Sequence, residues 1–314
     1  MEKSITGNKI LAHLDRVVGD HKPITADIFL NNFCNDNCPY CTYKRWEFDD
    51  AARSMSYEDF VRYGTRLREL GVQGFILSGG GEPTIAKDFQ KIVGWLDAED
   101  IKYGINTNFN KFVKCNPQYL KVSLDAWDET SYKQKRGVYA YSQVVQNIVH
   151  FSEIKSEHTR LGIQLLAMDM DSVYKFYDAN RTLPVDYIVI RPVESTNGKY
   201  YSENPHTQSI TSAIDEIART DQRVIKNYKW DLLHQKFGRC IGQWSQIAIN
   251  ELGEVMYCCH KPYQIVGHIM DDDILEKKGN ADTDMNMCDV PCRLTGVNHD
   301  LQKIYKQPIN PEFI

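Results

Sequence analysis

Three cysteines, Cys34, Cys38 and Cys41, stand close together near the N-terminus. Structural zinc sites commonly pair cysteines with further cysteines or histidines, and they need four ligands. Cysteine thiolates also hold iron–sulfur clusters, and a [4Fe–4S] cluster held by three of them leaves one iron to bind a small molecule. The spacing therefore indicates either a zinc site with a distant fourth ligand or a cluster with an open iron.

Five further cysteines lie near the C-terminus, which leaves only Cys115 isolated: Cys240, Cys258, Cys259, Cys288 and Cys292. The chain has 314 residues, a net charge of −5, and no apolar run approaching the ~20 residues of a bilayer span. Its N-terminus has no signal-peptide core, so we expect a cytoplasmic protein, in which clustered cysteines indicate metal or redox chemistry. No basic run indicates binding to nucleic acid or to a membrane.

These cysteines must be positioned by the elements around them, and the first two-thirds of the chain alternates between two patterns. Six apolar, β-rich runs predict strands at 26–32, 74–78, 102–108, 119–126, 160–167 and 186–193. Amphipathic stretches predict helices at 56–70, 86–99, 141–155, 170–180 and 206–219. Repeated βα units predict a parallel sheet whose chemistry lies at the carboxyl ends of the strands.

We therefore predict an α/β fold in which residues 1–225 form a partial (β/α)6 TIM-like barrel, with an open doubly wound sheet as the alternative. The pattern changes after residue 225. Residues 246–259 predict a β-hairpin with Gly253 in its turn, so residues 226–314 are predicted to form a small hairpin and loop domain.

The segment CNDNCPYC, residues 34–41, resembles the C-x3-C-x2-C signature of radical S-adenosylmethionine (radical SAM) enzymes, including the aromatic Tyr40 before the last cysteine. The resemblance implies that S-adenosylmethionine (SAM) binds the open iron of a [4Fe–4S] cluster. It also implies that a flavodoxin or ferredoxin supplies an electron, and that the resulting 5′-deoxyadenosyl radical abstracts hydrogen from a substrate.

The segment SGGGEPT, residues 78–84, directly follows the second predicted strand. Glycines let a backbone approach a ligand closely, although a tight strand-to-helix turn alone would also explain them. The segment is similar to the family's GGE-type motif, which implies that Gly79, Gly80, Gly81 and Glu82 contact SAM.

Polar residues near the ends of later strands match positions that the family uses for SAM or substrate. The resemblance implies that Asn106, Ser123 and Asp125 bind the ribose or the substrate, and that Arg191 pairs with the SAM carboxylate or acts on the substrate. The alternative is that each is an ordinary polar residue at a strand end.

The C-terminal cysteines resemble the auxiliary-cluster module of twitch and SPASM radical SAM enzymes. Cys240 and Cys258 are separated by 17 residues and flank the predicted hairpin, as in that module. The resemblance implies a second [4Fe–4S] cluster held by Cys240, Cys258, Cys288 and Cys292, although the last two are one residue further apart than in the family. A structural zinc site is the alternative.

Cys259 is left over in this assignment. It can replace Cys258 as a ligand, donate a hydrogen atom to a substrate radical, or be a packed thiol. We favour Cys258 as the ligand because it keeps the 17-residue gap. The neighbouring His260, Lys261 and Arg293 are expected to be ordinary surface charges. The alternatives are that they tune the cluster, since positive charge raises a reduction potential, or contact an acidic substrate.

An auxiliary cluster that accepts an electron implies an oxidoreductase. We expect it to act on a small polar substrate such as a sugar, cyclitol or nucleotide. A peptide-modifying enzyme is the less favoured alternative, because only about 24 residues precede the first predicted strand, too few for a leader-recognition domain. Redox-neutral epimerisation through Cys259 is a further alternative, and an iron–sulfur electron carrier or zinc-binding module is the non-enzymatic one.

Overall fold

The computed structural model describes residues 11–13, 15–16, 22–39, 41, 43, 51–193, 206–225, 237–283 and 294–305. Within them, a single ten-stranded sheet runs in the order β10-β9-β8-β1-β2-β3-β4-β5-β6-β7. The strands are β1 (Thr25–Phe29), β2 (Gly74–Ser78), β3 (Tyr103–Thr107), β4 (Tyr119–Ser123), β5 (Arg160–Ala167), β6 (Tyr187–Pro192), β7 (Val224–Ile225), β8 (Gln246–Ile249), β9 (Glu254–Met256) and β10 (Ile265–His268).

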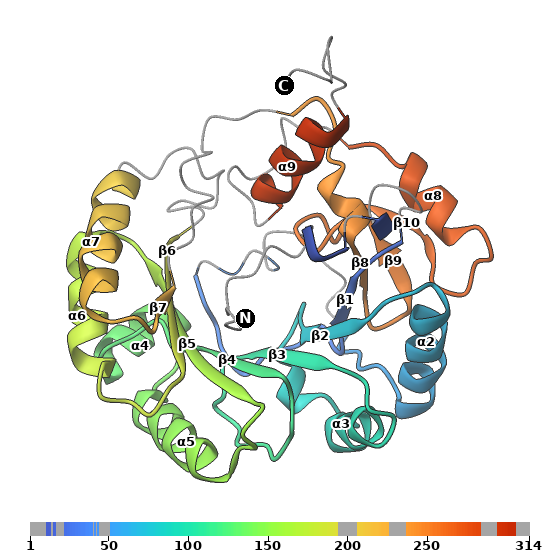
Figure 1. The fold of residues 1–314 in the computed structure, drawn as a ribbon. Coiled ribbons are helices and arrows are strands. Elements are labelled where there is room, and N and C mark those ends of the chain that lie inside the picture. Colours follow the sequence, from blue (N-terminus) through green and yellow to red (C-terminus); the bar gives the residue numbers. More distant parts are fainter. Residues whose placement is uncertain are drawn as a thin grey trace.

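Strands β1 to β7 are parallel, and each pairs with the next along the chain. Successive right-handed crossovers in one direction place every connecting helix on the same face of the sheet. The sheet therefore curls into a partial barrel with its helices outside, as Figure 1 shows. This arrangement confirms the predicted barrel and excludes the doubly wound alternative.

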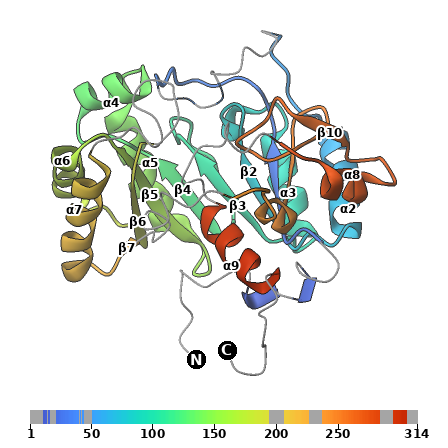
Figure 2. The same ribbon diagram turned by 90° about the horizontal axis from the view of Figure 1, so that it is seen from above.

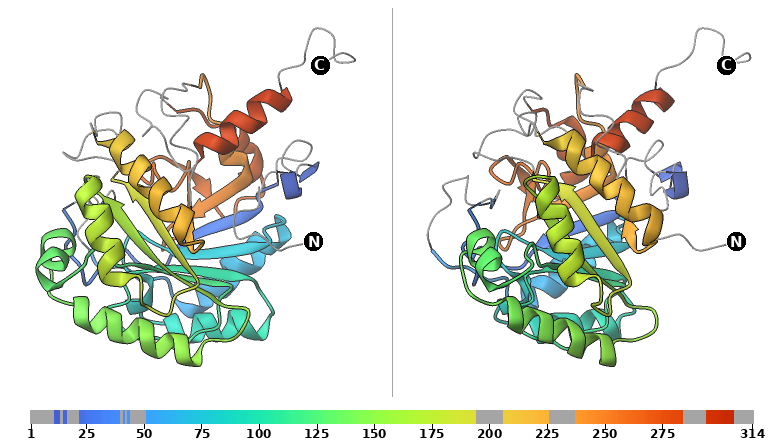
Figure 3. Two further views of the ribbon diagram at one scale, coloured as in Figure 1. Left: turned by 60° about the vertical axis from the view of Figure 1, so that its left-hand side comes forward. Right: turned by 90° about the vertical axis from the view of Figure 1, so that its left-hand side faces the viewer.

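The helices that cover the sheet bury apolar stripes against it, for example Phe60, Tyr63 and Leu67 of α2. Figure 3 shows α5, α6 and α7, coloured green to gold, on the outside of the barrel. The α-helices are α2 (Tyr57–Glu69), α3 (Phe89–Ala98), α4 (Glu129–Arg136), α5 (Tyr141–Ile154), α6 (Met170–Asn180), α7 (Thr207–Thr220), α8 (Ile274–Asn280) and α9 (Thr295–Tyr305). Short 3-10 turns are η1 (Leu11–His13), η3 (Pro83–Ile85) and η6 (Gly242–Ser245).

All six predicted strands and five predicted helices are present, with ends that differ by a few residues at most. Helix α4 was missed, because its sequence ETSYKQKR has no apolar stripe and buries only Ser131 and Tyr132. Capping interactions at its two ends stabilise this helix instead. Asp128 and Ser131 make a reciprocal capping box at its start, and Gly137 ends it with a left-handed φ of 80°.

The predicted hairpin is also present, as β8 and β9, with Gly253 in the turn at φ 78°. Strand β8 pairs in parallel with β1, so the hairpin continues the sheet of the barrel. The orange and red C-terminal elements accordingly lie beside the blue first strand in Figure 3. The division of the chain into two domains at residue 225 stays a prediction.

No helix among the described residues combines the length and the apolar character that crossing a membrane requires.

The turn at Gly253 gives a test of how the hairpin is fixed to the barrel. A Cβ there would lie 2.5 Å from Tyr63 Cζ and 2.7 Å from His268 Nε2. We expect Gly253→Ala to lower the free energy of unfolding by about 2 kcal/mol, since it adds this clash to an unfavourable φ. Gly94, exposed within α3 with open space around it, is the matched control, and Gly94→Ala is expected to stabilise by about 0.5–1 kcal/mol. Denaturant unfolding of both variants measures this, and equal effects would contradict it.

Candidate active site

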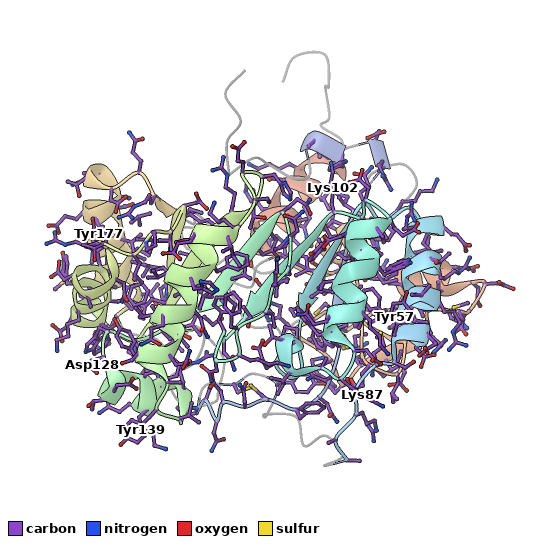
Figure 4. The ribbon with its side chains drawn as sticks, turned by 90° about the horizontal axis from the view of Figure 1, so that it is seen from below. Tyr57, Lys87, Lys102, Asp128, Tyr139 and Tyr177 are labelled. Atoms are coloured by element: carbon purple, nitrogen blue, oxygen red, sulfur yellow. The ribbon has the colours of Figure 1, made fainter. Side chains whose placement is uncertain are left out.

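One cavity of about 480 Å³ lies at the carboxyl ends of the barrel strands. Figure 4 shows which end this is: Lys87 and Asp128, which follow β2 and β4, lie opposite Lys102, which precedes β3. The predicted residues that line the cavity are Cys34, Cys38, Cys41, Gly79, Gly80, Gly81, Glu82, Asn106, Ser123, Asp125, Arg191 and Cys259. Tyr40, Cys288, Cys292 and Arg293 fall outside the described residues, so their predicted roles stay predictions.

The three N-terminal cysteines lie in the loop that follows β1. Cys34 Sγ accepts hydrogen bonds from the Asp36 backbone N–H at 3.4 Å and from Asn108 Nδ2 at 3.7 Å. Cys34 is exposed and Cys38 half-buried, and partial desolvation by the surrounding protein raises the pKa of the Cys34 thiol to about 11 and that of Cys38 to about 12. Thiolates at these positions therefore need a compensating positive charge, which iron would supply together with these N–H donors.

In the described part of the chain, no three His, Cys, Asp or Glu side chains converge as the ligands of one metal ion do. Thiolates of an iron–sulfur cluster bind different irons, so they line a space and do not converge on a single point. Three cysteines on the wall of one cavity fit that requirement.

Arg136, the last residue of α4, holds this cysteine loop against the barrel. Its Nε donates to Asp36 Oδ2 at 2.8 Å, and its Nη1 donates to Asp125 Oδ2 at 2.9 Å. The Asp36 side chain is 0% exposed and that of Asp125 is 5% exposed, so both carboxylates are buried against one guanidinium. Asp125, whose φ is 57°, also accepts the Leu166 N–H at 2.7 Å, which joins the ends of β4 and β5.

Further hydrogen bonds hold the cysteine loop against α4 and the segment that follows β3. Asn110 Nδ2 donates to Asp36 Oδ1 at 2.6 Å, and the Tyr132 hydroxyl donates to Asn110 Oδ1 at 2.7 Å. The Asn37 N–H donates to the Arg136 carbonyl at 2.8 Å. A Cβ on Gly137 would lie 2.5 Å from the Asn37 carbonyl oxygen, so only glycine permits this approach. Figure 2 shows α4 at this end of the barrel, beside the blue segment that follows β1.

The glycine segment after β2 packs on the same loop. The backbone N–H groups of Gly81 and Glu82 donate to the carbonyls of Asn31 and Phe33, both at 2.9 Å. A Cβ on Gly81 would lie 1.9 Å from the Phe33 carbonyl oxygen, and one on Gly80 would lie 2.2 Å from the Tyr43 ring. These glycines are therefore required for loop-to-loop packing.

Glu82 is buried, with both carboxylate oxygens bonded within the protein. Oε1 accepts from Thr84 N at 3.1 Å, from Thr84 Oγ1 at 2.7 Å and from Thr107 Oγ1 at 2.5 Å, while Oε2 accepts from Asn108 N at 2.7 Å. Burial raises the pKa of Glu82 despite these four bonds. The structure thus gives this carboxylate a positioning role at the ends of β2 and β3, and its contact with SAM stays a prediction.

Side chains from the strands complete the cavity. Asn106 Oδ1 is buried and has no hydrogen-bond partner among the described residues, so a ligand that donates a hydrogen bond fits there.

Sequence reasoning missed several lining residues, notably Asp27, Lys121, Lys135 and Gln164. The available signal was the alternation of polar and apolar residues within the strands, as in KVS of β4, where Val122 faces the helices.

Lys135 belongs to α4 and differs from the other missed residues. Its Nζ is buried without a hydrogen-bond partner in the described structure and lies 5.0 Å from the centre of the Trp127 ring. Burial lowers the pKa of Lys135. A buried ammonium on the cavity wall favours a ligand that carries negative charge.

The C-terminal cysteines separate into two environments. Cys240 and Cys258 are buried together in one apolar cluster with Tyr257 and Leu294. Cys259 packs near Phe29 and lines the barrel cavity instead. The choice of Cys258 over Cys259 as a cluster ligand with Cys240 stays a prediction.

His260 also lines the barrel cavity. The expectation of surface charge was wrong for Lys261, which is 3% exposed and donates to Thr283 Oγ1 at 2.7 Å. Its burial comes from the fold around the turn after β9, which the local sequence does not indicate.

Comparison with known proteins gives the family of this site. The family model described as the Radical SAM superfamily matches residues 28–169, which contain the cysteine loop, the glycine segment and strands β2 to β5. These residues form a radical SAM domain.

Solved structures of proteins with bound S-adenosylmethionine share the fold over most of the chain. SuiB of Streptococcus suis, bound to S-adenosylmethionine, covers 95% of this chain and 79% of its own at a TM-score of 0.62 and 14% identity. Native anSMEcpe with bound AdoMet covers 84% of this chain and 82% of its own at a TM-score of 0.59 and 15% identity. Among curated proteins, a probable GTP 3′,8-cyclase of Saccharolobus islandicus is 24% identical over 213 residues, 64% of this chain and 68% of its own.

The radical SAM domain implies SAM and a [4Fe–4S] cluster, and the residues present fit them. Three thiols share one wall with N–H donors directed at Cys34 Sγ, and a buried acceptor at Asn106 faces the same space. Cys34, Cys38 and Cys41 would hold the cluster.

Arg136 offers a test of how the cysteine loop is held. We expect Arg136→Leu to lower the free energy of unfolding by about 3–5 kcal/mol, because it leaves two buried carboxylates without their counter-charge. Arg160→Leu is the matched control. Its side chain is 56% exposed and lies 3.7 Å from Asp186, so removing it is expected to cost at most about 1 kcal/mol. Urea unfolding of the protein without cofactors compares the two, and similar losses would contradict the assigned role.

Proposed function

We propose that this radical SAM domain binds SAM on a three-cysteine [4Fe–4S] cluster and abstracts hydrogen from a small polar substrate held in the same cavity. The observation that carries the proposal is that Cys34, Cys38 and Cys41 line one cavity with the glycine segment and the polar strand ends. When bound, the cluster and SAM supply a carbon-centred radical that takes a hydrogen atom from a C–H bond. The protein's own residues bind, orient and shield the reactants.

Roles for these residues follow from their contacts. Asn106, Ser123 and Arg191 face the cavity and are proposed to bind SAM or substrate directly. Tyr40 and the backbone of Gly79, Gly80 and Gly81 are proposed as further SAM contacts, as the family motif implies. Glu82 and Asp125 bond mainly within the protein, so we propose that they act by positioning the strand ends.

The buried ammonium of Lys135 supports a substrate that carries an anionic group. Lys135 Nζ is without a hydrogen-bond partner in the described residues, whereas Arg136 on the same cavity is already paired with Asp36 and Asp125. Among the sugar, cyclitol and nucleotide options, the relatives named as GTP 3′,8-cyclases favour a nucleotide. A peptide-modifying enzyme is the second candidate, since the similar SuiB has been solved bound to its precursor peptide SuiA.

We further propose an auxiliary [4Fe–4S] cluster on Cys240, Cys258, Cys288 and Cys292. The burial of Cys240 and Cys258 in one cluster supports this assignment. A cluster there supplies an electron acceptor within the protein, which makes a net two-electron oxidation of the substrate possible. A flavodoxin or ferredoxin is the proposed reductant, and free thiols with oxygen-sensitive clusters suit the reducing cytoplasm.

Cys259 favours one alternative reaction. Its place on the cavity wall, beside His260, would let its thiol return a hydrogen atom to a substrate radical. The thiyl radical left on Cys259 would then take one electron from the proposed auxiliary cluster and a proton from solvent, so the substrate would be epimerised without net oxidation.

Cleavage of SAM gives the primary test. We expect the anaerobically reconstituted, reduced protein to form 5′-deoxyadenosine from SAM, and Cys38→Ala to abolish this because one cluster ligand is lost. Cys115→Ala is the control, since Cys115 packs against the core and does not line the cavity. Chromatography with mass detection measures the product. Continued cleavage by Cys38→Ala, or none by the wild type with any reductant, would refute the proposal.

The fate of the substrate separates oxidation from epimerisation. With nucleotides as first probes, GTP among them, we expect a product that has lost two hydrogens, and we expect Cys259→Ala to form it as well. An epimerase would give an isomer of unchanged composition that gains one deuterium in D2O, and Cys259→Ala would not release it. Mass spectrometry of the two proteins in D2O distinguishes these outcomes.

A further inference from the structure

Lys278, on α8, is a buried lysine beside the C-terminal cysteines. It is 4% exposed, and its Nζ donates to the Gln243 backbone carbonyl at 2.9 Å and to the Gln243 side-chain oxygen. Gln243 Nε2 donates back to the Lys278 carbonyl at 3.1 Å. Both acceptors are neutral. The ammonium therefore has hydrogen-bond partners but no negative charge beside it among the described residues.

Helix α8 lies beside these cysteines, since Ala281, the residue that follows it, packs against the apolar cluster of Cys240 and Cys258. Burial lowers the pKa of Lys278 to about 8, and the charges of Cys258, Cys240 and Cys259 act in the opposite direction. Among the described residues, no carboxylate forms an ion pair with it. The adjacent Lys277, by contrast, is exposed and pairs with Asp271 and Asp273, both at 2.9 Å. A buried ammonium without a counter-charge is costly, so this position favours negative charge on the sulfur atoms.

A second polar group is directed at the same cysteines from another helix. Asn298, on α9, is 1% exposed, and its Nδ2 donates to Cys240 Sγ at 3.2 Å. Its Oδ1 accepts the Gly242 N–H at 2.6 Å. This contact fixes the orientation of the amide, because the oxygen must face the donor on Gly242, which leaves the NH2 group for sulfur.

We propose that Lys278 and Asn298 are positioning and tuning residues that stabilise the negative charge of an iron–sulfur cluster held by Cys240 and Cys258. This inference rests on the auxiliary cluster of the proposed function. A [4Fe–4S] cluster with four thiolates is an anion, and each added electron makes it more negative. A nearby ammonium stabilises the reduced form more than the oxidised form, so it raises the reduction potential of that cluster.

In the protein without iron, Lys278→Met removes a buried positive charge but also leaves both Gln243 oxygens without the donor that Nζ supplies, so the melting temperature does not report on the cluster. In the reconstituted protein, we expect Lys278→Met to lower the reduction potential of the auxiliary cluster.

Potentiometric titration followed by electron paramagnetic resonance tests this on the reconstituted full chain. We expect Lys278→Met to lower the potential of the auxiliary cluster and to leave that of the SAM-binding cluster unchanged. Lys278→Arg should keep the wild-type value, and so should Lys277→Met, which removes an exposed charge. Asn298→Leu should lower the potential in the same direction, because it removes the N–H donor to Cys240, and it provides a second variant if Lys278→Met loses iron.

The failures of the two proposals are distinguishable. Wild-type protein that binds iron for only one cluster would overturn the auxiliary cluster, and this inference with it. Full iron content with equal auxiliary potentials in the wild type, Lys278→Met and Asn298→Leu would overturn the inference alone.

Discussion

The site depends on one interaction, the guanidinium of Arg136 between the carboxylates of Asp36 and Asp125. Burying any one of these charges alone would carry a large desolvation free energy. The short, charge-assisted hydrogen bonds between them offset much of that free energy. Asp36 lies within the cysteine loop and Asp125 at the end of β4, so the pair fixes a loop to a strand end.

Around this interaction, residues that suggest chemistry in the sequence often act as scaffold. The carboxylate of Glu82 is bonded by the ends of β2 and β3, and Gly80 and Gly81 allow two loops to pack. The cavity is instead lined by alternate residues of the strands, such as Lys121 and Gln164. A barrel strand presents one face to the helices and the other to the interior, so polar residues at every second position end up inside.

The pairing of β8 with β1 joins the two cysteine regions. It brings the turn after β9 to the barrel, where the adjacent Cys258 and Cys259 serve different environments. Two cysteines joined by a single peptide bond therefore lie in two different environments, one in the apolar cluster with Cys240 and one on the wall of the barrel cavity.

The sequence by itself determined what depends on local pattern. Strands β2 and β5 occupy the predicted residues, α2 begins within one residue of its predicted start, and the spacing of the cysteines indicated the family. These features follow from periodicity, capping and motif spacing, which a short window contains. The rest depended on contacts between distant residues. Arg136 meets Asp36 across 100 positions in a helix that has no apolar stripe, and the side on which Cys259 lies depends on β8 joining β1. Only the tertiary structure could decide these, because a buried charge or thiol takes its role from partners that the local sequence does not contain.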